Sequence, residues 1–168
     1  EILSKDGSVN ILPLQLADIL GIDIHTQVWN LLKKDPMRTL LYPYLLQSGS
    51  KARLEKVTDF AMLHLDAYLQ DERLVIPLLR GLMSVPPWGG DIIAECLSSL
   101  HEGARSVAVE GLEAWPDKKW NGKLQMALVR ARELTTQPIL RMRIDELLNH
   151  KTLEFEDFVN YMKDQKGL

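Results

Sequence analysis

The stretch Gly81-Leu82-Met83-Ser84-Val85-Pro86 returns 30 residues later as Gly111-Leu112-Glu113-Ala114-Trp115-Pro116. A second pair of segments, Trp88-Gly89-Gly90 and Trp120-Asn121-Gly122, matches at an offset of 32 residues. Pro77-Leu78-Leu79 also resembles Pro138-Ile139-Leu140 at an offset of 61 residues, about two units later. Self-similarity at a fixed period is typical of stacked structural repeats. The matches therefore predict a unit of about 30–32 residues, made of two helices with a turn between them.

Apolar spacing around these segments predicts helices along almost the whole chain. Between 101 and 115 the apolar positions recur at helical spacing, at Ala104, Val107, Ala108, Gly111, Leu112 and Trp115. The same reasoning predicts helices over 51–69, 73–85, 91–100, 123–134 and 138–148, with shorter ones over 11–20, 26–34 and 36–47. We expect Pro43 to kink or split the last of these, and Pro77 and Pro138 to occupy first turns of helices. No segment alternates apolar and polar residues, so no sheet is predicted and the fold class is all-α.

A hairpin of two helices cannot bury its apolar stripe alone, and stacked neighbours must cover it. Gly81 and Gly111 fall on inward faces, where we expect the missing side chain to let helices approach closely.

The segment Arg73-Leu74-Val75-Ile76-Pro77-Leu78-Leu79-Arg80-Gly81-Leu82 resembles the inner helix of a HEAT-like helical repeat. The resemblance covers about 72–148, and its unit is shorter than the roughly 40–47 residues usual for HEAT repeats. It implies a right-handed α-solenoid of HEAT-like helical hairpins, an α–α superhelix. On this basis the chain is one structural domain, with irregular N-terminal helices or a cap over 1–50, HEAT-like repeats over 51–150 and a C-terminal capping helix over 151–168.

The composition is that of an ordinary globular chain. Its 168 residues are 46% hydrophobic and 26% charged, with a net charge of −3, which argues against disorder. The longest run without charged or strongly polar residues, 40–46, is far shorter than the roughly 20 residues that span a bilayer. Cys96 is the single cysteine, and the first residues lack the features of a secretory signal. We therefore expect a cytoplasmic protein with no membrane partner.

Candidate catalytic groups are sparse. Cys96 and His101 are spaced as a nucleophile and base, but Cys96 falls in an apolar stripe, where cysteine is usually inert packing. His64, two positions before Asp66, reads in the same way as a core histidine. The chain has no Cys pair, no His-x-x-x-His or Glu-x-x-His spacing and no phosphate-binding glycine motif, so no metal and no cofactor is expected. Asp91 and Glu95 have an i, i+4 spacing that suits a cation, although such pairs more often face water. Catalytic residues can be dispersed in sequence, which keeps an enzyme as an alternative.

Charge is segregated along the chain. Residues 55–113 include ten acidic and four basic residues, a net charge of −6, whereas 115–151 include eight basic and four acidic residues, a net charge of +4. HEAT-like DNA glycosylases bind DNA along a basic concave face, so this resemblance implies a nucleic-acid-binding alternative. The overall net charge of −3 argues against it.

The function that we predict is protein–protein interaction, with the chain acting as a scaffold that performs no catalysis. Solenoids present long continuous surfaces, and here the concave face is expected along the helices around 73–85, 104–115 and 138–148. Trp88 and Trp120 lie at turns between helices, where they either anchor a partner or fill gaps between units, and we favour the second role. The candidate binding residues are Arg73, Arg80, Arg105, Glu110, Arg141, Asp145, Trp88 and Trp120.

Overall fold

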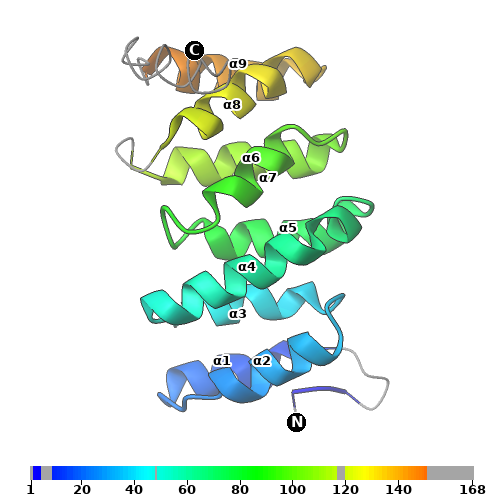
Figure 1. Ribbon diagram of the computed structural model, residues 1–168, viewed down its shortest axis with the longest axis vertical. Coiled ribbons are helices and arrows are strands. Elements are labelled where there is room, and N and C mark those ends of the chain that lie inside the picture. Colours follow the sequence, from blue (N-terminus) through cyan, green and yellow to red (C-terminus); the bar gives the residue numbers. More distant parts are fainter. Residues whose placement is uncertain (1, 5–8, 48, 117–119, 151–168) are drawn as a thin grey trace, which may run out of the picture.

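The structure, a computed structural model, describes residues 2–4, 9–47, 49–116 and 120–150, and these residues are almost entirely helical (Figure 1). Leu3 and Val9 form an isolated antiparallel bridge, and the described residues contain no strand. The prediction of an all-α chain is confirmed for them, whereas the capping helix expected over 151–168 lies outside the described residues. The helices are α1 (Ile11–Ile19), α2 (His25–Lys34), the 3-10 helix η1 (Thr39–Leu41), α3 (Tyr42–Gln47), α4 (Lys51–Tyr68), α5 (Glu72–Leu82), α6 (Gly90–Leu97), α7 (Glu102–Ala114), α8 (Gly122–Leu134) and α9 (Pro138–His150).

The prolines correct two details of the prediction. The break expected at Pro43 falls one residue earlier, because η1 ends at Leu41 and Pro43 lies in the first turn of α3. Pro77 does not begin a helix but lies buried inside α5, which starts at Glu72. There Asp71 accepts a hydrogen bond from the backbone N–H of Arg73 at 3.0 Å and so caps the helix. Only Pro138 begins its helix, so the 61-residue offset does not join equivalent positions.

The helices pack in two rows that run along the longest dimension of the molecule (Figure 1). In one row α3 packs against α5, α5 against α7, and α7 against α9. In the other, α4 packs against α6 and α6 against α8. Sequence neighbours such as α6 and α7, or α8 and α9, connect the rows. One hydrophobic core of buried side chains extends from Leu14 to Leu147, so each layer covers the apolar side of the next.

The two glycines of the repeated segment differ in their surroundings. A β-carbon at Gly81 would lie 2.7 Å from Leu46 Cδ1 and 3.1 Å from Pro43 Cα, so α5 and α3 approach closely there as expected. At Gly111 the nearest atom is Met83 Cγ at 3.4 Å, an ordinary contact with a flexible side chain. The expectation of a close approach at Gly111 is therefore wrong.

Candidate functional site

The helices expected to line a binding face are α5, α7 and α9, and they form one of the two rows. Arg73, Arg80, Glu110 and Arg141 are exposed on them. The Arg73 guanidinium pairs with Asp71, with 2.6 Å between Nη2 and Oδ2. Asp145 on α9 is half-buried and forms an ion pair with Arg132 on α8. The first four residues are therefore placed where a partner can reach them.

Arg105 is not part of that surface. Its side chain is 4% exposed, and its Nη1 and Nη2 donate to the carbonyl oxygens of Ser99 at 2.6 Å and Leu134 at 3.3 Å. These carbonyls lie just after α6 and at the last residue of α8, where helix carbonyls lack partners within their own helix. Arg105 thus joins two helix ends, and we remove it from the candidate binding residues.

The two tryptophans of the candidate set pack against the core. Trp88 and Trp120 are each half-buried, just before the N-caps of α6 and α8, Gly89 and Asn121. Trp115, at the end of α7, is fully in the core and donates its Nε1–H to the Leu82 carbonyl at 3.2 Å. All three indoles therefore pack within or against the core near helix ends.

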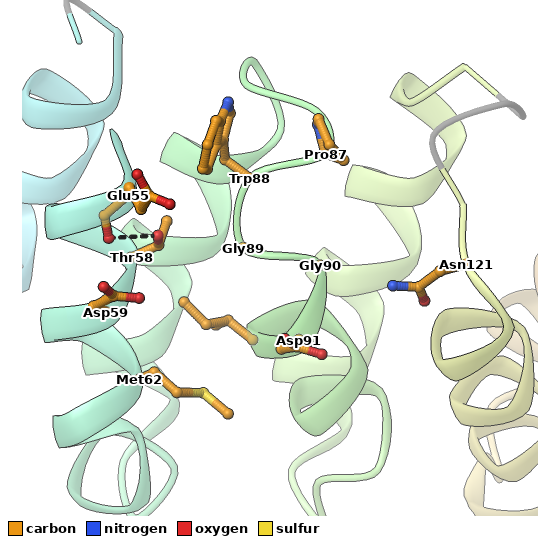
Figure 2. Close-up of a pocket in the computed structure, with 11 residues that line it drawn as sticks. Glu55, Thr58, Asp59, Met62, Pro87, Trp88, Gly89, Gly90, Asp91 and Asn121 are labelled. Carbon is orange, nitrogen blue, oxygen red and sulfur yellow. Dashed lines mark hydrogen bonds between the residues drawn. The ribbon is translucent and has the colours of Figure 1, made fainter. Parts of the chain in front are cut away.

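Trp88 also borders a hollow of about 330 Å³ between α4, α6 and the start of α8 (Figure 2). The carboxylates of Glu55, Asp59 and Asp91 lie around it, and none of the described residues that line it is basic. Thr58 anchors the α4 side, because its hydroxyl donates to the backbone carbonyl of Glu55 at 3.0 Å. An acidic rim beside an indole suits a cationic side chain of a partner.

One carboxylate of this hollow is already paired within the chain. Lys123 Nζ lies 3.1 Å from Asp91 Oδ1 and 3.4 Å from Glu95 Oε1, so these acids do not simply face water. Sequence reasoning missed Glu55 and Asp59, although their i, i+4 spacing places both on one face of α4.

Cys96 and His64 have packing environments, while the candidate base His101 is half-buried at the N-cap of α7. Burial, with the nearby Glu95 charge, raises the pKa of the Cys96 thiol to about 12. The partly buried His64 ring lies 4.6 Å from Phe60 and 6.3 Å from Tyr68, centroid to centroid. Among the described residues no group of three or more His, Cys, Asp or Glu side chains could hold a metal ion. Nor does that part of the chain contain a helix long and apolar enough to cross a membrane.

The outer face of α1 is apolar. Leu14 and Ala17 point into the core, while Leu12, Leu16, Ile19 and Leu20 follow i, i+4, i+7, i+8 spacing on the opposite side. These four are 48–78% exposed, and Ile11 and Ile22 extend the patch. Asp18 is the single charged residue between 9 and 22. Terminal caps of helical arrays carry a polar outer face, and this side of α1 is apolar instead.

Comparison of the chain with models of protein families, with curated proteins and with solved structures finds no match.

Proposed function

We propose that the chain is a protein-binding module, built as a right-handed solenoid of HEAT-like helical hairpins, and that it holds a partner without performing chemistry on it. The two rows of stacked helices support this arrangement. The helix starts follow the repeat as well, because α5 and α7 begin at residues 72 and 102, while α6 and α8 begin at 90 and 122. We also propose a cytoplasmic location, because a single free cysteine is compatible with a reducing compartment.

The exposed aliphatic face of α1 carries the proposal. Covering one leucine or isoleucine side chain contributes about 1.5–3 kcal/mol, and contiguous apolar patches on folded proteins mark protein interfaces. Helix α1 has no basic residue that would favour an anionic partner. The partner that we propose is a protein that presents an apolar surface of its own.

The nucleic-acid alternative depends on the basic residues of 115–151, and several of them are already paired within the chain. Lys123 pairs with Asp91 and Glu95, while Arg132 pairs with Asp145. Arg143 pairs in turn with Glu113. Charges that are already balanced within the chain release fewer counterions from a phosphate backbone, which is the main source of such affinity. We therefore keep protein binding as the proposed function.

Site-specific photo-crosslinking in the cells that make this protein tests the proposal. A benzoylphenylalanine at position 19 on α1 is compared with one at Leu63 on α4, because both native side chains are 78% exposed. A third probe at Glu110 tests the predicted face of α5, α7 and α9. We expect a discrete protein adduct from position 19 that is lost when Leu16→Asp is added, and no adduct from position 63.

The outcomes separate the surfaces. Equal adducts from positions 19 and 63 would mean nonspecific contact and would overturn the argument from α1. An adduct from position 110 alone would keep protein binding but move the partner to the face predicted from sequence. No adduct from any position would contradict the proposed function.

A further inference from the structure

A groove of about 450 Å³ separates α2 from the first turns of α4. His25, Trp29 and Lys33 line it from α2, and Arg53 and Lys56 line it from α4. The lining is thus rich in cations, although neither helix belongs to the basic segment 115–151. Asp23, at the edge, accepts a hydrogen bond from Arg53 Nη2 at 3.1 Å and offsets part of the charge.

Two ring nitrogens beneath the groove surface have no hydrogen-bond partner among the described residues. They are Nε2 of His25 and Nε1 of Trp29, whose side chains are 6% and 8% exposed. A buried donor without a partner costs free energy, and such atoms in native proteins usually meet water, an ion or a ligand. The Trp29 indole can only donate, so its partner must offer an acceptor oxygen.

The two lysines are gathered around the same indole. Lys33 Nζ lies 5.8 Å and Lys56 Nζ 5.7 Å from the centre of the Trp29 ring. Two positive charges near one indole raise the positive potential of the groove, and a bound anion lowers it. Because the lysines already lie over the indole, the ring has little room to stack on a nucleic-acid base. The groove therefore suits an anion rather than an aromatic ligand.

We propose that this groove binds a phosphoryl group, with Lys33, Arg53 and Lys56 balancing its charge and the ring nitrogens of His25 and Trp29 donating to its oxygens. Both nitrogens are buried in the structure, so binding requires a local side-chain movement that opens them to the groove. A phosphate monoester carries close to two negative charges and three strong acceptor oxygens. It therefore suits three cations, one of them offset by Asp23, and two neutral donors better than a carboxylate does. The site is separate from the α1 face and does not depend on the proposed function.

Nuclear magnetic resonance titration of the whole chain tests the site. Inorganic phosphate, O-phosphoserine and acetate are added separately at constant ionic strength, while the indole N–H signals are followed. The Trp29→Phe variant assigns one of the four indole signals. We expect the Trp29 signal to shift saturably with both phosphate compounds and the other three to remain in place. The pKa of His25, which burial and the Arg53 charge hold below its usual value, should rise when phosphate is bound.

A matched pair of lysine variants distinguishes a site from general electrostatics. Lys56→Gln removes a charge from the groove, whereas Lys51→Gln removes the same charge from the first turn of α4 outside the lining. We expect Lys56→Gln to raise the Kd for phosphate about tenfold, or about 1.4 kcal/mol, and Lys51→Gln to leave it nearly unchanged. Equal weakening by both variants, equal binding of acetate, or no saturable shift of the Trp29 signal would each overturn the proposal. Binding of O-phosphoserine but not inorganic phosphate would identify a phosphorylated side chain as the source.

Discussion

Replacing Gly81 by alanine adds one methyl group at the contact between α5 and α3, and we expect that methyl group to lower the free energy of unfolding. The new carbon would lie 2.7 Å from Leu46 Cδ1 and 3.1 Å from Pro43 Cα. Leu46 is fully buried, and Pro43 contributes backbone, so neither can turn aside. Helix α3 must then shift away from α5.

The magnitude follows from two opposed effects. Overpacking a well-filled contact costs about 1–3 kcal/mol, while alanine in place of glycine favours a helix by about 0.5–1 kcal/mol. Gly81→Ala should therefore destabilise the protein by up to about 2.5 kcal/mol. Gly111→Ala is the matched control, because it meets only Met83 Cγ at 3.4 Å. There the helix preference should prevail and stabilise the protein by up to about 0.5–1 kcal/mol.

Urea unfolding, followed by far-ultraviolet circular dichroism and by tryptophan fluorescence, measures both variants. Coincidence of the two signals shows whether the transition is two-state, which a layered helical array need not satisfy. If Gly81→Ala were as stable as Gly111→Ala, the argument from the α3–α5 contact would fail.

Three further perturbations follow from buried groups. Arg105→Ala should lower the free energy of unfolding by about 2–4 kcal/mol, because it leaves carbonyls at two helix ends without their donor. Urea unfolding measures this, and a loss below about 0.5 kcal/mol, as is usual for surface substitutions, would contradict it. Cys96, with its thiol pKa raised to about 12, should react with a thiol reagent at pH 8 only in denaturant, so rapid native labelling would disprove its burial. Burial raises the pKa of Tyr42 and Tyr68 in the folded protein. The stability linked to the raised tyrosine pKa values is complete below the unfolded tyrosine pKa of about 10 and is lost as pH rises above it. The urea midpoint should therefore fall above about pH 10, and it should fall less steeply in Tyr42→Phe.

Helices in the second half of the chain could be predicted because each has one apolar stripe and clear breaks. Helix α7 lies between α5 and α9 in its row and also packs on α6, so its buried surface is wider than the predicted stripe. Arg105 and Val109 are therefore buried, although neither is among the apolar positions that predicted this helix. The spacing of apolar residues reflects the polarity around one helix. It carries no information about backbone carbonyls at the end of a neighbouring helix.

Other features depend on tertiary contacts that no local pattern records. Pro77 is tolerated inside α5, where its burial in the core outweighs the missing backbone hydrogen bond. His25 is buried at the first residue of α2, and it lines the groove that separates α2 from α4. The basic groove that it lines comes from two helices whose cations are spread over more than twenty residues of sequence. Such a site leaves no compact motif to find.

The opposed charges of 55–113 and 115–151 become contacts between successive layers. Lys123 on α8 pairs with the acids of α6, and Arg143 on α9 pairs with Glu113 on α7. Glu102 accepts hydrogen bonds from the backbone N–H groups of Thr136 and Gln137, just before α9 begins. Exposed pairs of this kind contribute only about 0–1 kcal/mol each, so they orient the last layer while the core holds it. These charges at the end of the array are thus paired within the chain, and the exposed aliphatic face of α1 is where we place the proposed protein partner.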